Sequence, residues 1–575
     1  MKKFIVYISV LALTLPFFTS CESMLEEEVY GQQTVDEMMA NESNVVLLVG
    51  QAYADIKWTH DHWGYWGVSS LTADECVCPV RMPGEHWSDG GYWRNLNTHR
   101  WNEFGDAFKN IWNTTIQGAV LCNKLIATLD SAQVKTHVMS EHVYNQYVGE
   151  LEVLRTYYYF NLFECFGRIP YTETFDEKDN AKPLAEPYQV WSYLVASLEK
   201  NAPNLPIQGA PGDANYGRCT QGMAYTLLAR LYLNAPSYGC TPENIDKTML
   251  ANYCTINSET DFYQEAARCC ENVISSGAYK IADNFFDNFL INNEKSPENI
   301  FVIIEDGRDN FDSRSSGSMS NKLRVNLLTL HYCHETTYSM QEKPWNGFCA
   351  RPKFIQRYNE EDVRGYGNEG KGTMNEKQWG WFVGPVCDAE GKQLKDQNDT
   401  VAIIRPTIKS LTEATWNDGA RMIKYEIDKV GTYHYCENDF VLLRYADVLW
   451  MNEEARMRGA TNAINHMSDA DFQTMLERTF AYSADPMAAF KAAYGDPAAW
   501  TLDDILDERG REFAWEMVRR RDLIRFDKFN DASYVDYLAS GLNSTRNWFP
   551  IPYSVLEKAE RDENGNAIWT QNPGY

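Results

Sequence analysis

Five segments with helical periodicity limit what this chain can fold into more than any other feature. In residues 141–166 apolar side chains recur every three or four positions, which places them along one face of a helix. Gly167 follows where that helix is expected to end. Four other segments share the period and are expected to pack as pairs, 218–235 with 262–276 and 439–458 with 502–529. Helix pairs of this size resemble tetratricopeptide units.

Long stretches without a clear period separate these helices. They cover residues 59–105, 236–261, 306–350 and 364–422. Loops of this length in a compact protein are usually functional or disordered, and residues 59–105 and 330–350 are too aromatic for disorder. The sequence therefore predicts an all-α dominated fold, in which a tetratricopeptide-like helix-pair bundle carries a loop-rich ligand-binding half with few short strands.

The first 30 residues have the pattern of a secretion signal. Lys2 and Lys3 precede an apolar run that is short for a membrane span, and the run closes on FTSC, which resembles a bacterial lipobox. Cleavage before Cys21 and attachment of lipid to its sulfur would leave a protein held to a membrane by acyl chains. We therefore expect a signal peptide (1–20), a lipid-anchored tether (21–40) and one domain (41–575).

Charge and cysteine usage narrow the class of partner. A net charge of −27 repels phosphate backbones and anionic lipid, so we expect no nucleic-acid binding. The 14 cysteines show no zinc-ligand spacing, and the sequence His-Tyr-Cys-His at 331–334 is interpreted as separate contacts and not as a metal site. Neither a metal nor a cofactor is expected.

Tryptophan is concentrated near the start of the domain. Seven of the 17 Trp residues fall between Trp58 and Trp112, among Gly, Asp, His and Asn. Because a buried indole N–H needs a partner, such a cluster favours a surface that receives a ligand over a simple core. Trp63 and Trp66, interleaved with glycine, are expected in the loop as ligand contacts, with Trp63 as an exposed platform. Trp101 and Trp112 fit the core at the start of the next helix.

Eight motifs, taken together and in order, resemble the SusD/RagB family of surface lipoproteins from glycan-foraging bacteria. The resemblance runs nearly from end to end. It is carried by GELEVLRTYYYFNLFECFGRIP (149–170), YGRCTQGMAYTLLARLYL (216–233), YQEAARCCENVISSGAYKI (263–281), ENIFVII (298–304), FVLLRYADVLWMNEEA (440–455), ERGREFAWEMVRRRDLIRF (508–526), FPIP (549–552) and QNPGY (571–575).

The resemblance implies a fold, a partner and an activity. Members combine a tetratricopeptide-like bundle with a loop-rich half, and sit as a lid on a SusC-like TonB-dependent transporter in the outer membrane. They capture oligosaccharides, or in some cases peptides, and are binding proteins and not enzymes. Some hold a structural calcium, whose ligands the sequence does not identify here.

Residues 70–101 resemble the ligand-binding pattern of a subfamily. The matching positions are Asp74, Arg81, Trp87, Asp89, Gly90, Gly91, Trp93 and His99. The departures are Met82, Asn97 and His86, and His86 leaves no carboxylate where the pattern usually has Asp. A flat indole covers the C–H face of a pyranose while polar groups reach its hydroxyls, which supports Trp87 as a platform.

Several of these residues have a second interpretation. Trp93 and His99 would equally brace the loop from inside, and Gly90-Gly91 would make a tight turn. A second aromatic point, KPWNGFCARPKF (343–354), offers Trp345 as an opposite platform and Asn346 as a hydrogen-bonding partner, or else a tight Asn-Gly turn.

Two carboxylates offer a catalytic alternative. Glu508 and Glu512 lie one helical turn apart, as a glycosidase pair would. Arginines crowd the same helix, which favours an ion-pair network.

The sequence thus predicts a surface-exposed, outer-membrane glycan-binding lipoprotein that serves a transporter. The alternatives are the same architecture for peptides or glycopeptides, and an adhesion lipoprotein without an import role.

Overall fold

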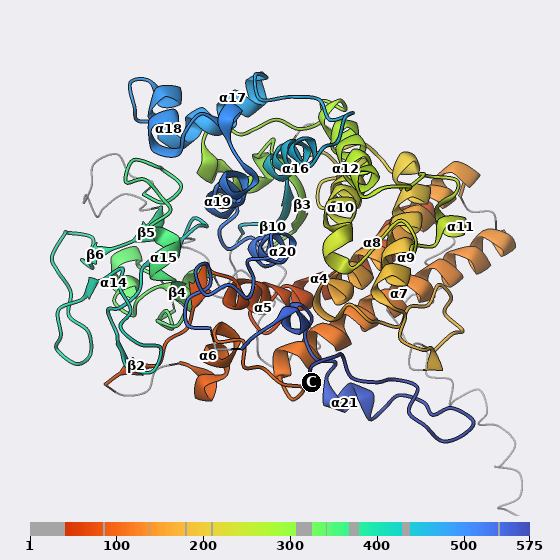
Figure 1. The fold of residues 1–575 in the computed structure, drawn as a ribbon, viewed down its shortest axis with the longest axis horizontal. Helices are drawn as coiled ribbons and strands as arrows, with labels where there is room; N and C mark the ends of the chain where they lie inside the picture. The colour runs from red at the N-terminus through yellow and green to blue at the C-terminus, as the bar shows by residue number, and fades with distance from the viewer. Residues whose placement is uncertain are drawn as a thin grey trace, which may run out of the picture.

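The computed structural model describes residues 41–83, 87–136, 139–178, 181–208, 211–305, 325–340, 342–366, 379–427, 437–538 and 541–575, and helices dominate them (Figure 1). The expected signal peptide, tether and lipidation site at Cys21 lie outside this part of the chain. No helix within it is both long and apolar enough to cross a membrane.

Consecutive long helices form the scaffold on the right of Figure 1. Helix α7 packs on α8, α8 on α9, α9 on α10, α10 on α12 and α12 on α16. These helices are α7 (Asp106–Thr136), α8 (Glu141–Phe166), α9 (Pro187–Asn201), α10 (Gln221–Asn234), α12 (Glu259–Ile274) and α16 (Tyr445–Met457). Each of these long helices packs on the next long helix along the chain, as expected for a tetratricopeptide-like bundle.

Helix α8 shows how the sequence defines an element of this bundle. Ser140 caps it by accepting a hydrogen bond from the amide of Val143, and Gly167 ends it at φ 67°. Every residue from Gly149 to Phe166 is buried or nearly so, because α7 and α9 cover it. The periodicity predicted its bounds, and the predicted packing of 218–235 on 262–276 is confirmed as α10 on α12.

Two predicted helices differ in the structure. Residues Phe440–Arg444 form strand β10, which pairs antiparallel with β3 (Asn299–Ile303) before α16 begins. Segment 502–529 divides into α19 (Leu502–Glu512) and α20 (Arg519–Arg525). Trp515 and Met517 adopt φ values of 62° and 66° between these two helices, a conformation that no right-handed helix contains.

Shorter α-helices and strands complete the part of the chain that the structure describes. The remaining helices are α3 (Glu42–Gln51), α4 (Ala54–Thr59), α5 (Tyr65–Thr72), α6 (Tyr92–Asn97), α11 (Lys247–Leu250), α13 (Val325–Thr329), α14 (His334–Tyr338), α15 (Pro352–Ile355), α17 (Ala470–Glu477), α18 (Pro486–Tyr494) and α21 (Tyr553–Leu556). The remaining strands are β1 (Cys76–Val77), β2 (Arg81–Met82), β4 (Cys349–Ala350), β5 (Gly380–Phe382), β6 (Gly384–Pro385), β7 (Ile403–Ile404), β8 (Ala414–Thr415) and β9 (Arg421–Ile423).

The short strands join loops that are far apart in the sequence. Strand β1 pairs antiparallel with β4, and β2 pairs parallel with β8, while β5–β9 and β6–β7 are antiparallel pairs. These pairings bring the three loop regions around 76–82, 349–350 and 380–423 together at the left of Figure 1, opposite α9 and α11. The predicted class, a helical bundle with a loop-rich half and few short strands, is confirmed.

Candidate ligand-binding site

A hollow with a volume of about 310 Å³ opens in the loop-rich half. It is lined by Trp87, Tyr332, Lys343, Pro344, Trp345 and Gln397. These residues come from the segments next to β2, α14, β4 and β7, which lie at one end of the molecule in Figure 1. The hollow therefore exists only because the short strand pairs hold separate loops against one another.

Aromatic rings form the inner wall of the hollow and continue behind it. The ring centroids of Trp87 and Trp345 are 5.0 Å apart, and Trp93 lies 5.7 Å from Trp87. Trp63 follows, 4.4 Å from Trp93. His62 touches Trp87, Trp93 and Trp345, with centroid distances of 5.7 to 5.9 Å. Such a cluster is rigid, because each indole is held by its neighbours.

Trp345 is presented by a tight turn. Its amide donates to the carbonyl oxygen of Leu327 at 2.7 Å, and Asn346 next to it adopts φ 54°, which asparagine tolerates better than most residues. Gly347 completes the turn under the Trp87 ring. A Cβ at position 347 would lie 2.3 Å from Trp87 Cε3, so only glycine lets the two segments approach this closely.

Buried guanidinium groups hold this turn from behind. Arg81 Nε donates to the carbonyl oxygen of Asn346 at 2.7 Å, and Arg421 Nη2 donates to Asn346 Oδ1 at 2.7 Å. Asn346 is itself fully buried. The turn interpretation of Asn346 therefore holds, and its expected role as a direct ligand partner is corrected, because its side chain is used within the protein.

Four more residues that were predicted to contact the ligand are almost fully buried. The exposed fractions are 2% for Trp66, 1% for Asp74, 1% for Arg81 and 0% for Trp93. Direct ligand contact by these four residues therefore finds no support in the structure. Trp66 belongs to the core, where its Nε1 donates to the carbonyl oxygen of Trp515 at 3.0 Å.

Asp74 takes part in an ion pair that joins the loop to the scaffold. Its two carboxylate oxygens accept hydrogen bonds from Arg519 at 2.7 and 2.8 Å, and Arg357 lies 3.3 Å away. Burial by itself would raise the pKa of Asp74, but Arg519 and Arg357 hold that pKa below its usual value. Asp74 therefore stays ionised and positions the loop that precedes the hollow.

The residues around α6 brace the cluster. Asp89 is exposed and accepts a hydrogen bond from Trp93 Nε1 at 2.7 Å, while Gly90 and Gly91 form a turn at φ 63° and 86°. His99 is buried with Nε2 2.8 Å from the carbonyl oxygen of Thr72, and burial lowers its pKa to about 3. For Trp93 and His99 the bracing interpretation is the one that the structure favours. The pattern residue His86 lies outside the described residues.

Three predicted platforms keep part of a ring at the surface. Trp63, Trp87 and Trp345 are each partly buried, and Trp87 and Trp345 line the hollow directly. Ligand contact by these three residues, and by the exposed carboxylate of Asp89, stays a prediction. The core interpretation of Trp101 and Trp112 is confirmed, with 6% and 3% exposed.

The hollow also contains residues that the sequence did not point to. Tyr332 lies within the His-Tyr-Cys-His run, Lys343 stands two residues before Trp345, and Gln397 carries no motif at all. The Lys343 ammonium sits 4.9 Å from the centroid of the Tyr332 ring. In the sequence, only the proximity of Lys343 to Trp345 indicated that Lys343 belongs to the site.

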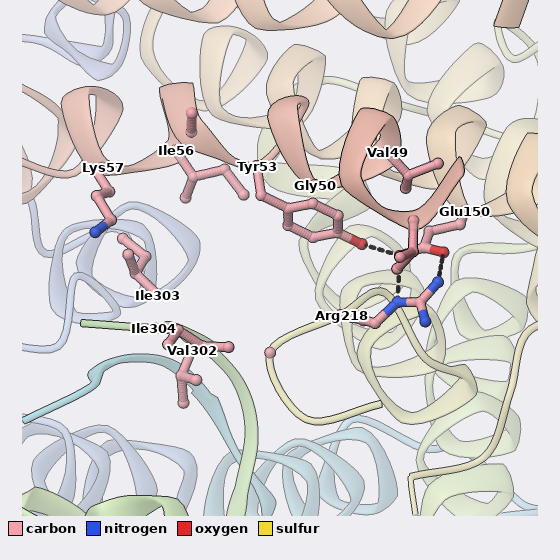
Figure 2. A pocket seen from close by; sticks show the side chains of 13 residues that line it. Val49, Gly50, Tyr53, Ile56, Lys57, Glu150, Arg218, Val302, Ile303 and Ile304 are labelled. Carbon is pink, nitrogen blue, oxygen red and sulfur yellow. Dashed lines mark hydrogen bonds and ion pairs between the residues drawn. The ribbon is translucent and has the colours of Figure 1, made fainter. Parts of the chain in front are cut away.

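A second hollow, also of about 310 Å³, is built differently (Figure 2). Its walls are aliphatic and come from α3, α4 and the end of β3: Val46, Val49, Ile56, Val302, Ile303 and Ile304. At one end Tyr53 and Arg218 both bond to Glu150, as the dashed lines in Figure 2 show. Without a pair of flat ring faces, this hollow is a poorer fit to a pyranose than the first.

Glu508 and Glu512 lie in a buried ion-pair network. Arg364 contacts both carboxylates at 2.6 and 3.0 Å, and Arg444 and Arg478 contact Glu512 at 3.1 and 2.8 Å. Both side chains are at most 1% exposed, and Arg511 on the same helix pairs with Glu508. The predicted network is confirmed, although most of its arginines come from other elements.

The resemblance to the family also allows a structural calcium ion. Within the described residues no three His, Cys, Asp or Glu side chains come together as a metal site. The part of the chain described here therefore offers no cluster to which such an ion is assigned.

A helix-pair scaffold that carries a loop-built aromatic hollow defines a class of binding protein. Comparison with known proteins identifies the family. The family described as "SusD family" matches residues 297–575, and one described as "Starch-binding associating with outer membrane" matches residues 78–233. The chain belongs to the SusD family, as the eight motifs indicated.

One curated relative and several solved structures are similar to the chain. Starch-binding protein SusD of Bacteroides thetaiotaomicron is 25% identical over 461 residues, which cover 74% of this chain and 72% of the relative. Surface glycan-binding protein A from the same organism, solved in complex with laminarihexaose, has a TM-score of 0.64 at 20% identity, covering 92% of this chain and 99% of that one. The protein of the same name from Bacteroides fluxus has a TM-score of 0.64 at 19% identity, with 93% and 100% covered.

Proposed function

We propose that this chain is a surface glycan-binding lipoprotein that captures oligosaccharides and delivers them to a TonB-dependent transporter of the outer membrane. The proposal includes lipid attachment at Cys21, an outer-membrane location facing the exterior, and no catalytic role. The observation that carries it is the pair of partly buried indoles, Trp87 and Trp345, that line one hollow.

The two indoles suit a sugar for physical reasons. A pyranose presents a C–H face of roughly 50–100 Å² to an indole, and burial of that area at about 25 cal/mol per Å² contributes on the order of 1–2.5 kcal/mol. Two platforms with hydrogen bonds from Lys343 and Gln397 reach micromolar to millimolar affinity once the cost of association is subtracted. A hollow of about 310 Å³ lies at the lower end of ligand-site volumes, which fits one or two sugar rings.

The comparisons support the same ligand class. The relative from B. thetaiotaomicron is named a starch-binding protein, and a solved protein of similar fold holds laminarihexaose. The description of the second family names the outer membrane. The transporter partner and the lipid anchor rest on the family resemblance and on the first 21 residues of the sequence.

A binding role also agrees with where the carboxylates lie. Among the residues that the structure describes, none that lines the hollow is Asp or Glu, whereas a glycosidase needs two carboxyl groups across the bound sugar. The one carboxylate pair at helical spacing that suggested catalysis, Glu508 and Glu512, is neutralised by arginines in the buried network.

The test is calorimetric binding of the full chain in mild detergent to neutral glycans, acidic glycans and oligopeptides. Trp345→Ala is expected to weaken sugar binding roughly 10- to 50-fold, the loss of one stacking face. Tyr482→Ala is the control, because Tyr482 is 57% exposed and lies outside the hollow. Binding of peptides with no response to any sugar would transfer the proposal to the peptide alternative.

The delivery role needs a separate experiment. We expect the full chain to co-purify with a TonB-dependent transporter when both are expressed in one outer membrane. A chain that binds sugar but never associates with such a transporter would support the adhesion alternative.

A further inference from the structure

Two buried cations stand directly behind the turn that carries Trp345. Arg81 is 1% exposed and Arg421 is fully buried. Both guanidinium groups donate mainly to backbone carbonyl oxygens, of Asn346, Gly347, Thr415, Trp416, Asp418 and Gly419, besides the amide oxygen of Asn346 and the sulfur of Cys349. None of these acceptors is a carboxylate.

This arrangement leaves the two guanidinium groups without a carboxylate as hydrogen-bond acceptor. Buried charges in proteins are usually paired with an opposite charge, whereas carbonyl dipoles solvate a cation without neutralising it. Burial, and next to it repulsion by the charge of Arg81, lower the pKa of Arg421, and the nearby Cys349 and Asp418 offset only part of this effect. Guanidinium groups nevertheless remain protonated in proteins. An anion placed in the hollow would relieve that repulsion.

A third cation stands in the hollow itself. Lys343 lines it, is exposed, and lies over the Tyr332 ring. Among the described residues no carboxylate is ion-paired with Lys343.

Acidic residues also lie in this region. Asp418 pairs with Arg405 at 2.8 Å, and Asp396 accepts hydrogen bonds from the amides of Asn398 and Thr400 at 2.8 and 3.0 Å. Arg405 offsets Asp418, but amide hydrogen bonds leave the negative charge of Asp396 in place, and Glu342 directly precedes Lys343 in the chain. The positive charges of Arg81, Arg421 and Lys343 thus stand against two carboxylates, in a protein whose net charge is −27. At distances below the screening length of about 8 Å, the local charges outweigh the distant ones.

We propose that the hollow selects a negatively charged sugar, either a uronate or a sulfated residue, whose anionic oxygens meet Lys343 while its ring lies on Trp345. This inference rests on the proposed glycan-binding function and adds to it the chemical class of the sugar. An ammonium that binds a carboxylate or sulfate forms a shorter and stronger hydrogen bond than one that binds a hydroxyl. A neutral sugar gains no such bond.

The test compares sugars that differ only in charge. Uronate oligosaccharides are measured against their carboxyl-reduced counterparts of identical linkage, and sulfated oligosaccharides against desulfated ones, by calorimetry with the full chain in detergent. The variants are Lys343→Gln and, as a matched loss of one exposed charge on α7, Lys109→Gln. Binding is repeated at low and high salt.

The charged member of a pair is expected to bind about tenfold more tightly at low salt, and high salt is expected to reduce that advantage. Lys343→Gln is expected to lose about fivefold for the charged sugar and nothing for the neutral one, while Lys109→Gln changes neither. Preference for only the uronate or only the sulfated ligand identifies the anion. Equal binding of charged and neutral partners, with Trp345→Ala still impaired, overturns this inference and keeps the proposed function. No binding of any sugar by the folded chain overturns both.

Discussion

Replacement of Glu512 by Gln is expected to destabilise the protein through one buried charge. In the described structure Glu512 belongs to a connected set of five cations and five carboxylates: Lys424, Arg364, Arg444, Arg478 and Arg511 with Asp362, Glu298, Glu508, Glu512 and Glu516. The set is balanced, so Glu512→Gln leaves it with one buried positive charge in excess.

The expected loss of stability in Glu512→Gln follows from the burial and the partners of this carboxylate. Removal of one partner from a buried ion pair costs about 3–5 kcal/mol, and the glutamine retains an acceptor of the same shape, which places the loss near 3 kcal/mol. Burial alone would raise the pKa of Glu512, but Arg478, Arg444 and Arg364 together hold that pKa well below its usual value. The carboxylate therefore stabilises the fold above the unfolded-state pKa of about 4.3, and this contribution is lost as pH falls further.

Urea unfolding followed by tryptophan fluorescence measures the free energy of unfolding. We expect Glu512→Gln to lose about 3 kcal/mol at pH 7, and the gap to the parent to narrow below about pH 4. Lys395→Ala is the matched control, because its pair with Asp399 is 54% and 85% exposed, and it should change stability by less than about 0.5 kcal/mol. A loss in Glu512→Gln no larger than in the control would refute the assignment of Glu512 as a buried network member.

Two further substitutions test the hollow and an ion-paired histidine. Gly347→Ala should displace the Trp87 ring, which its Cβ would meet at 2.3 Å, and weaken sugar binding about tenfold in calorimetry; unchanged affinity would show that Trp87 is not a platform. His466 lies 2.7 Å from Asp469 and 2.9 Å from Glu271; burial alone would lower its pKa, but these carboxylates raise it overall. The resulting stabilisation is present below about pH 6.5 and is lost as pH rises through the raised pKa. In urea unfolding, His466→Gln should therefore lower the free energy of unfolding more at pH 5.5 than at pH 9. An equal loss at both pH values would contradict the pairing.

The scaffold was largely predictable because its signals are local. The periodicity of 141–166 and the glycine at 167 give helix α8 with its bounds, since capping and packing faces depend on neighbouring residues. The break between α19 and α20 was not predictable, because positive φ at Trp515 and Met517 follows from tertiary contacts and leaves no mark on the period.

The site was predictable in part, for a different reason. An aromatic cluster in a loop indicates platforms, and Trp87 and Trp345 do line one hollow. The type of a polar residue does not show which way it faces. Asp74 is buried by a partner 445 residues away, Arg519, and Arg81 holds a turn 265 residues away at Asn346. Such long-range pairs decide burial, and a single sequence does not display them.

The most direct test of the central claim is a structure of the full chain bound to a sugar that calorimetry has identified. The account predicts a pyranose ring lying against Trp345 and Trp87 in the loop-built hollow, with its polar groups toward Lys343 and Gln397. A sugar seated in the aliphatic hollow of Figure 2, or elsewhere with Trp87 and Trp345 uncovered, would contradict it.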